Sequence, residues 1–304
     1  MVDRDSSPHR SLGSFGVWCP ELRTRDQRKA EEIAAGIEEL GFSILWIPGG
    51  TGGPLFEHVT TVLGATRKLP VATAVTNMIM HDPADAAGWF TAMEREHPGR
   101  LILGLGASNA QRAEAIGVPY RPMSRTTEYL DRLDEAGVPA SRRLLGALGP
   151  RMLEVARDRA LGAHTYVVDP GHTRRARRVL GPDRLLCPVV KVAAESDVQA
   201  AFAAARANLV PYMGMATYRR SLLSMGYTEK DLSDGGSEQM ISALVVLDGV
   251  AAALARAREH LDAGADHVCF QVVTADRRDV PWETWNELAS AVTLSSGSSA
   301  GSTS

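Results

Sequence analysis

The feature that most constrains the fold is a series of eight short apolar segments, nearly all followed by a segment with helical spacing of its apolar residues. In chain order these segments are Phe15–Cys19, Phe42–Ile47, Val71–Val75, Leu101–Leu105, Arg143–Leu148, His164–Val168, Leu185–Lys191 and Asp266–Val273. Strands that are apolar on both faces are typical of a parallel sheet covered by helices. Eight such units in 304 residues predict a (β/α)8 barrel.

The intervening segments predict the helices of that barrel. They are Asp26–Leu40, Glu57–Arg67, Pro83–His97, Thr126–Ala136, Met152–Leu161, His172–Leu180 and Trp282–Val292, together with helices over Glu195–Met225 and Glu238–Leu261. Asp82 is placed to cap a helix that has Pro83 as its first residue. About seventy residues separate the seventh strand from the eighth, so we expect an extra helical insertion there.

An open, doubly wound sheet is the alternative arrangement of these units. A dinucleotide-binding sheet of that kind carries Gly-x-Gly-x-x-Gly directly after its first strand. In this chain the glycine turns follow the fourth and fifth strands, at Gly104–Ser108 and Leu148–Met152. This position favours the barrel. Two glycine turns in neighbouring loops also suggest one anionic ligand held between them, although ordinary strand-to-helix turns contain glycine as well.

Composition excludes several classes of partner. A net charge of −3 gives no electrostatic basis for binding nucleic acid or an anionic membrane. No apolar run is long enough to cross a bilayer, and residues 1–10 lack the apolar core of a secretory signal. The odd number of cysteines, Cys19, Cys187 and Cys269, is typical of buried thiols in a reducing compartment. We therefore expect a cytoplasmic protein.

Three regions follow from this pattern. We expect a flexible N-terminus over residues 1–12, a single barrel domain over 13–293 and a disordered Ser/Gly-rich tail over 294–304.

The chemistry of a (β/α)8 barrel lies where its strands end. The predicted strand ends supply tryptophan, amide, hydroxyl and glycine backbone, with Asp169 as the one carboxylate and Lys191 as the one lysine. A metal-dependent hydrolase needs several converging hard ligands, so we predict no metal site. A lining of this kind suits a planar, anionic cofactor that carries the hard chemistry itself.

Several motifs in this order resemble the luciferase-like superfamily, which comprises bacterial luciferase and the deazaflavin-dependent reductases. The resemblance covers about residues 14–292, and the segments that carry it are 37–42, 45–48, 72–77, 103–108, 128–131, 147–152 and 260–268. The closest likeness is to the branch that uses coenzyme F420, a deazaflavin hydride carrier. Members that use FMN are nearly as similar.

The resemblance implies a set of cofactor-binding residues. In the family the third strand contains a bulge with a non-prolyl cis peptide behind the central ring, which here falls at Ala74–Val75, with Thr76 and Asn77 near the ring. The resemblance also implies that Gly149, Arg151 and Met152 contact the phosphate of the cofactor. It implies that Gly106, Ala107 and Ser108 contact the side chain of the cofactor.

Fewer of the family's catalytic residues have a counterpart in this chain. Members often have an acidic residue or histidine just after the second strand, where this chain has Pro48–Gly53. Proton transfer then falls to His81, with His58 as a second candidate, because histidine titrates near neutral pH. Asn77 and Trp46 are the other predicted catalytic residues, and Trp46 is equally consistent with simple packing.

These implications favour an F420-dependent oxidoreductase that transfers a hydride between the deazaflavin and a small organic substrate. An FMN-dependent monooxygenase is the alternative with related chemistry. A lyase that uses Lys191 as a Schiff base and a non-catalytic cofactor-binding paralogue are alternatives of other classes. Homodimers are frequent in the resembling family, and the sequence identifies no interface.

Overall fold

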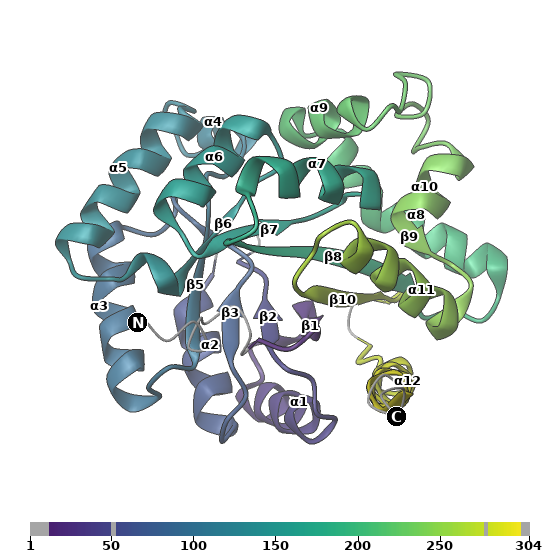
Figure 1. Ribbon diagram of the computed structural model, residues 1–304, viewed down its shortest axis with the longest axis horizontal. Helices are drawn as coiled ribbons and strands as arrows, with labels where there is room; N and C mark the ends of the chain where they lie inside the picture. Colours follow the sequence, from purple (N-terminus) through teal and green to yellow (C-terminus); the bar gives the residue numbers. More distant parts are fainter. Residues whose placement is uncertain (1–11, 50–52, 277–278, 299–304) are drawn as a thin grey trace.

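A computed structural model describes residues 12–49, 53–276 and 279–298 of the chain. Its parallel strands form a closed ring in the order β1-β2-β3-β5-β6-β7-β8-β10, because β10 pairs with both β8 and β1. Figure 1 shows this barrel surrounded by helices. The strands of the ring are β1 (Phe15–Trp18), β2 (Leu45–Ile47), β3 (Val71–Thr73), β5 (Leu101–Gly106), β6 (Arg143–Gly146), β7 (Gly162–Thr165), β8 (Leu185–Ala193) and β10 (Val268–Val273). The predicted (β/α)8 barrel is therefore confirmed, and the open sheet is wrong.

Two short strands lie outside this simple ring. β4 (Thr76–Asn77) continues the path of β3 and pairs with β5. β9 (Val245–Val246) pairs with β8 at Lys191 and Val192.

The helices agree with the sequence prediction except in the segment after β5 and near the insertion. They are α1 (Gln27–Glu39), α2 (Leu55–Ala65), α3 (Pro83–Glu96), α4 (Ala110–Ala115), α5 (Pro122–Glu135), α6 (Pro150–Arg159), α7 (Pro170–Leu180), α8 (Val198–Met213), α9 (Ala216–Ser224), α10 (Glu238–Leu244), α11 (Gly249–Asp262) and α12 (Trp282–Ser298). α4 was not expected, and the Asn109 side chain caps it by accepting from the Arg112 amide at 2.9 Å.

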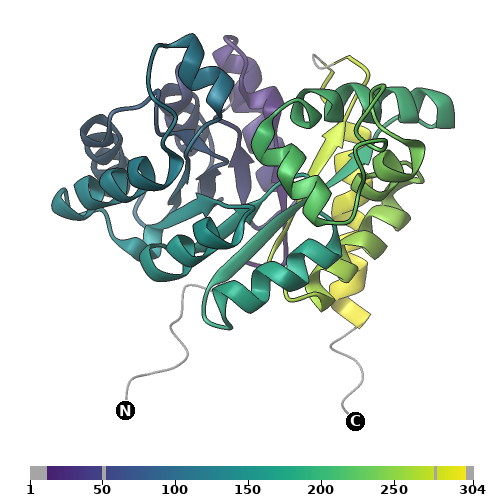
Figure 2. The same cartoon turned by 90° about the horizontal axis from the view of Figure 1, so that it is seen from above.

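The predicted insertion between β8 and β10 is present, and it is more divided than expected. The helix predicted over Glu195–Met225 breaks into α8 and α9, since Pro211 lies in the last turn of α8 and Gly214 follows it. The helix predicted over Glu238–Leu261 is interrupted because Val245 and Val246 pair with β8 instead. The helices α8, α9 and α10 form a group to one side of the barrel, at the upper right in Figure 1 and on the right in Figure 2.

Alternation along the strands divides the buried residues into two cores. Leu103 and Leu105 face outward and pack against the surrounding helices, whereas Ile102 faces the barrel interior. The interior core also contains Trp46, and it continues beneath the inserted helices. The barrel is thus filled with side chains, and a ligand must bind at its mouth rather than pass through it.

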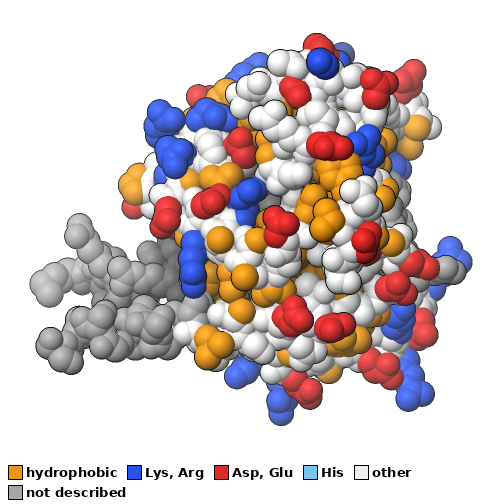
Figure 3. Space-filling model, turned by 90° about the vertical axis from the view of Figure 1, so that its right-hand side faces the viewer, with side chains coloured by type: hydrophobic (Ala, Val, Ile, Leu, Met, Phe, Trp, Pro, Cys, Tyr) orange, Lys and Arg blue, Asp and Glu red, His pale blue; other side chains and the backbone are white. Residues whose placement is uncertain are grey.

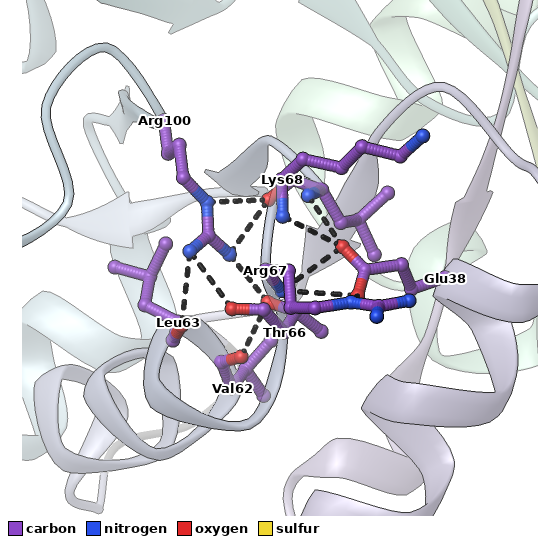
Figure 4. A network of polar contacts seen from close by, with 8 residues as sticks. Glu38, Val62, Leu63, Thr66, Arg67, Lys68 and Arg100 are labelled. Carbon is purple, nitrogen blue, oxygen red and sulfur yellow. Dashed lines mark hydrogen bonds and ion pairs between the residues drawn. The ribbon is translucent and has the colours of Figure 1, made fainter.

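A dense polar network closes the amino-terminal end of the barrel, opposite the mouth (Figure 4). The Arg100 guanidinium donates to the backbone carbonyls of Leu63, Thr66 and Leu69 and to the Thr66 hydroxyl. These carbonyls lie at and just beyond the end of α2, where helix carbonyl groups lack intrahelical partners. The Glu38 carboxylate accepts from the amides of residues 67–69. The structural role of this network is therefore to hold the segment between α2 and β3 in place.

The ends of the chain are only partly described. Leu12 is buried, and residues 1–11 of the predicted flexible segment lie outside the described residues. α12 extends to Ser298, so residues 294–298 of the predicted tail are helical. Residues 299–304 lie outside the described residues, and their disorder stays a prediction.

The burial of the cysteines and the mixture of charges on the surface agree with what the composition indicates. Cys19, Cys187 and Cys269 are free and buried. Within the described ranges, every helix is too short or too polar to cross a bilayer. On the face seen in Figure 3, basic and acidic side chains are interspersed.

Candidate functional site

The peptide bond between Ala74 and Val75 is cis, at the position that the family resemblance implies. Neighbouring glycines, which have no side chain, leave space for the backbone of this bulge. A Cβ atom on Gly49 would lie 1.8 Å from the Val75 carbonyl oxygen, and one on Gly104 would lie 1.8 Å from the Thr73 carbonyl oxygen. A Cβ atom on Gly106 would lie 2.3 Å from a methyl group of Val75. The glycines after β2 and in β5 therefore have a packing role at the mouth of the barrel.

Asn77 and Ser108, two of the predicted site residues, lie together at the mouth. The Asn77 amide Nδ2 donates to Ser108 Oγ at 3.0 Å, and Asn77 Oδ1 accepts from the Ile79 amide at 3.2 Å. Ser108 has a φ of 67°, a left-handed conformation that serine rarely adopts. The Thr76 hydroxyl, by contrast, donates to Thr73 Oγ1 at 3.0 Å and lies within the wall.

The N-terminus of α6 opens at the end of β6. Gly149 is its N-cap and provides no side chain to accept from the first helical amides. Gly149 is exposed with φ −91°, and nothing lies within 4 Å of the position of a Cβ atom. Arg151 is also exposed, and Met152 is half-buried. The unpaired amides and the helix dipole make this end suitable for an anion.

His172 holds the loop before α6 in place, a role that the sequence did not indicate. Its Nε2 is hydrogen-bonded to the Leu148 carbonyl at 2.9 Å, and its own amide donates to Asp169 Oδ1 at 2.6 Å. Asp169 therefore caps α7.

Aromatic side chains form the floor of the mouth on the side of β1 and β7. The Trp18 and Tyr166 rings are stacked with centroids 5.1 Å apart, and Tyr166 donates to Gln271 Oε1 at 2.8 Å. Trp18 Nε1 is buried without a hydrogen-bond partner among the described residues. A buried donor of this kind at a barrel mouth marks a place where a ligand acceptor can bind.

Lys191 lies beneath these rings with 1% of its surface exposed. Its Nζ donates to Asn208 Oδ1 at 2.5 Å and lies 4.2 Å from the centroid of the Tyr166 ring. The amine is covered by the Tyr166 and Tyr212 rings and bonded to Asn208, and a carbonyl substrate could reach it only by displacing them, so this geometry gives the Schiff-base alternative no support.

Trp46 lies in the barrel interior rather than at the mouth, so the geometry lends its predicted catalytic role no support, and that role stays a prediction. The side chain is fully buried in the barrel interior, and its Nε1 donates to His267 Nε2 at 3.1 Å. His267 precedes β10, at the amino-terminal end, where its Nδ1 contacts the Gly13 carbonyl at 2.8 Å. Trp46 also stacks on His164, whose pKa burial lowers to about 3. His164 is a core residue.

His81 lies at the rim, where its amide donates to the Asn77 carbonyl at 3.2 Å and its ring contacts Phe56 at 4.6 Å. Burial lowers the pKa of His81, and the positive charge of Arg23 lowers it further. Burial and Arg23 also lower the pKa of His58. Arg23 was not among the predicted site residues, because a single arginine after β1 carries no motif.

A cleft of about 680 Å³ opens beside His81, between α3 and α5. Tyr129 contributes a buried hydroxyl without a hydrogen-bond partner to its lining, together with charged residues of both signs. Among the described residues, no group of three or more His, Cys, Asp or Glu side chains is placed to hold a metal ion.

Known proteins share this fold. A protein of Mycobacterium tuberculosis, whose name describes a coenzyme F420-dependent oxidoreductase, is 25% identical over 278 residues, covering 72% of this chain and 77% of the relative. The structure of an F420-dependent secondary alcohol dehydrogenase with an F420-acetone adduct matches with a TM-score of 0.70 at 17% identity, covering 92% and 98% of the two chains. The oxygenating constituent of 3,6-diketocamphane monooxygenase from Pseudomonas putida, in complex with FMN, matches with a TM-score of 0.67 at 13% identity, covering 91% and 96%.

The family assignment rests on nearly the whole chain. The model of the luciferase-like monooxygenase family matches residues 14–293, from β1 into the last helix. The chain belongs to the luciferase-like monooxygenase family.

Proposed function

We propose that this chain is an oxidoreductase that uses coenzyme F420 and transfers a hydride between it and a small organic substrate at the barrel mouth. The observation that carries the proposal is the exposed N-terminus of α6, where Gly149 leaves open space beside unpaired amides. The names of the mycobacterial relative and of the alcohol dehydrogenase support F420 as the cofactor.

The residues at the N-terminus of α6 fit the phosphate of such a cofactor. The amides of Gly149, Arg151 and Met152 would bind it, since the first turn of a helix has free N–H groups and a positive dipole end. Pro150 has no N–H to donate. The exposed Arg151 guanidinium can add a charge-assisted bond of about 1.5–3 kcal/mol.

The ring of the cofactor would lie against β4 and the loop after β5. Ala74, Val75 and Thr76 would form its wall with backbone atoms, since the Thr76 hydroxyl already binds Thr73. Asn77 and Ser108, joined by their 3.0 Å hydrogen bond, would contact the ring edge. Gly106 and Ala107 would lie beside the cofactor side chain.

When bound, the deazaflavin supplies the hydride chemistry. The chain's own residues orient the substrate and exclude water, which lowers the barrier by fixing the reacting geometry. His81 would hold or release the proton that accompanies hydride transfer.

A paired equilibrium titration of cofactor-free protein with F420 and with FMN tests the proposal. Saturable binding of F420 at micromolar concentration or tighter, with weaker binding of FMN, is the expected result. A preference for FMN would instead favour the monooxygenase, for which the FMN-containing neighbour is the supporting observation. Binding of neither would contradict both proposals.

A further inference from the structure

The cleft between α3 and α5 lies apart from the proposed cofactor site. The two helices pack against each other in the outer layer of the barrel, at the left in Figure 1. The cleft has a volume of about 680 Å³, which is in the range of sites that bind small molecules. None of the residues proposed to contact the cofactor lines it, although the structure describes all of them.

One wall of the cleft contains two methionines and is fixed by backbone hydrogen bonds. It is the segment 78–83 between β4 and α3. The Met78 amide donates to the Gly106 carbonyl at 2.9 Å, and the Met80 amide donates to the Asn77 carbonyl at 3.0 Å. Methionine side chains make favourable contacts with apolar and aromatic groups. This wall therefore suits the apolar part of a ligand.

The facing wall is one side of α5. Its lining residues lie three and four residues apart, which places them along one stripe of the helix. They include Arg125, Glu128, Tyr129 and Arg132. The Arg132 guanidinium pairs with Glu135 at 3.5 Å. Arg125 is half-buried and Glu128 is exposed, and neither has an ion-pair partner in the part of the chain that the structure describes. One charge of each sign is thus available to a ligand.

Tyr129 adds a buried polar group that lacks a partner. It has 3% of its surface exposed, and its hydroxyl makes no hydrogen bond to any residue described. Burial raises the pKa of this hydroxyl, and the carboxylates of Asp82 and Asp85 at the start of α3 raise it further. Asp82 also lines the cleft. The hydroxyl therefore stays protonated at neutral pH, and a ligand that hydrogen-bonds to it and brings positive charge is favoured.

The charges of the lining oppose a ligand that carries charge of one sign only. The Asp131 carboxylate is already paired with Arg159 at 2.7 Å. An anionic ligand would still meet the carboxylates of Glu128 and Asp82, and a cationic ligand would meet the guanidinium of Arg125. A ligand that carries both charges is attracted by both groups.

We propose that this cleft binds an amino acid with a large apolar side chain, in its zwitterionic form. The carboxylate would accept from Arg125, whose planar guanidinium can donate two parallel hydrogen bonds to it. The ammonium would donate to the Tyr129 hydroxyl oxygen and to the Glu128 carboxylate. The apolar side chain would lie against Met78 and Met80. The site is independent of the proposed function, because no residue in it is assigned to the cofactor.

The test follows the methionine methyl signals by NMR while phenylalanine is added to cofactor-free protein. Met78→Leu and Met80→Leu assign the two signals, and we expect both to shift saturably. N-acetylphenylalanine keeps only the carboxylate, and phenylalanine methyl ester keeps only the ammonium. Each analogue should bind at least about tenfold more weakly than phenylalanine, because each loses one charge-assisted contact. Unchanged signals with phenylalanine would overturn the site, and an analogue that binds as tightly as phenylalanine would overturn the zwitterion.

Variants of the two charged residues separate the two ends of the ligand. Arg125→Gln should weaken the binding of phenylalanine about tenfold and should not weaken that of the methyl ester, which has no carboxylate. Glu128→Gln should weaken phenylalanine and should not weaken N-acetylphenylalanine, which has no ammonium. Arg28→Gln is the matched control, since Arg28 is an exposed arginine on α1 that pairs with Glu32 at 3.0 Å, and all three affinities should stay the same. Full affinity for phenylalanine in Arg125→Gln would refute the role of Arg125.

Tyr129→Phe distinguishes a hydroxyl that binds a ligand from one that is merely packed. The substitution removes only an oxygen that has no partner among the described residues, so the fold should keep or gain stability. Phenylalanine should nevertheless bind more weakly to this variant. Denaturation and the methionine signals measure the two effects. Unchanged affinity for phenylalanine at retained stability would overturn the contact with the hydroxyl.

F420 binding shows whether the cleft is a separate site. It is measured by fluorescence in the Arg125, Glu128 and Tyr129 variants, and it should match that of the unmodified protein. Displacement of phenylalanine by saturating F420 would show that the two ligands share one site and would overturn the proposal. If the unmodified protein binds no F420, the proposed function fails, while the methionine signals still report on the cleft.

Discussion

Gly49 and Val75 approach so closely that a Cβ atom on Gly49 would lie 1.8 Å from the Val75 carbonyl oxygen. The contact joins the end of β2 to the bulge after β3. A side chain at Gly49 could fit only if the backbone around Val75 moved, because the atom in its way belongs to the main chain. The glycine after β2 is therefore needed for packing at the mouth.

Gly49→Ala should destabilise the fold and weaken cofactor binding together. Overpacking of this kind typically costs about 1–3 kcal/mol, and a clash with backbone is at the upper end. Chemical denaturation and an F420 titration measure the two effects. Gly64→Ala is the control, since nothing lies within 4 Å of its Cβ position in α2, and alanine there should be neutral or stabilising. Equal stability of the two variants would contradict the packing argument.

Gly149→Leu should weaken cofactor binding and leave the stability of the fold nearly unchanged. Its backbone is extended and its Cβ position is open, so the variant should fold with nearly unchanged stability. A leucine side chain beside the first amides of α6 would obstruct a phosphate, and we expect F420 to bind at least about tenfold more weakly, or 1.4 kcal/mol. Gly88→Leu, on the exposed face of α3, controls for added apolar surface. Unchanged F420 affinity in Gly149→Leu would remove the phosphate assignment.

The sequence predicted the barrel well because its strands are buried on both faces and read as apolar runs. Its errors lie where tertiary contacts override local pattern. Val245 and Val246 continue a helical pattern, yet they pair with β8 because an edge of that strand is available. Alternation along β2 places Trp46 in the interior, and a strand of three residues gives too little pattern to show which side faces inward.

The rim was harder to predict than the barrel. The bulge at Ala74–Val75 came from the family resemblance, and neither composition nor periodicity indicates it. Arg23 and His172 have no motif around them, because their importance depends on which loops the barrel brings together. The closed ring makes β1, β2 and β3 neighbours, and the charge of Arg23 after β1 thereby lowers the pKa values of His58 and His81.

Substitution by phenylalanine should have different effects at Trp46, in the barrel interior, and at Trp18, at the mouth. Trp46→Phe removes the donor to His267 and leaves a buried ring nitrogen unpaired, which costs about 1–3 kcal/mol. Trp18 Nε1 has no partner among the described residues, so Trp18→Phe should cost less stability and weaken ligand binding instead. Denaturation and F420 titration of both variants distinguish the two roles. Loss of F420 affinity in Trp46→Phe, with stability retained, would restore Trp46 to the site.

Glu21 should make stability depend on pH between about 4.5 and 7. Burial raises its carboxyl pKa from 4.5 to about 7, although the Cys19 thiol donates to it at 3.1 Å. Between these values the folded protein keeps a proton that the unfolded chain has lost, so the stabilising contribution is complete below pH 4.5 and is lost as pH rises through 7. The loss amounts to about 3 kcal/mol at most.

Glu21→Gln tests this dependence by denaturation at pH 5 and pH 8. The variant should lose less stability than the unmodified protein between the two values. Glu39→Gln, an exposed carboxylate at the end of α1, should leave the difference unchanged. The same pH dependence in Glu21→Gln and the unmodified protein would show that another group causes it.

Arg100 should stabilise the fold without contributing to function, because its network lies at the amino-terminal end of the barrel (Figure 4). Arg100→Met leaves the carbonyls of Leu63, Thr66 and Leu69 without their charged donor, and we expect a loss of about 1.5–3 kcal/mol. Arg100→Lys should recover only part of it, since an ammonium cannot reproduce the planar fork of donors. Arg67→Met is the control: that side chain is 90% exposed, and its pairing with Glu38 at 3.8 Å should contribute little. All three variants should retain F420 affinity. A weakened affinity in Arg100→Met at unchanged stability would contradict the separation between the two ends of the barrel.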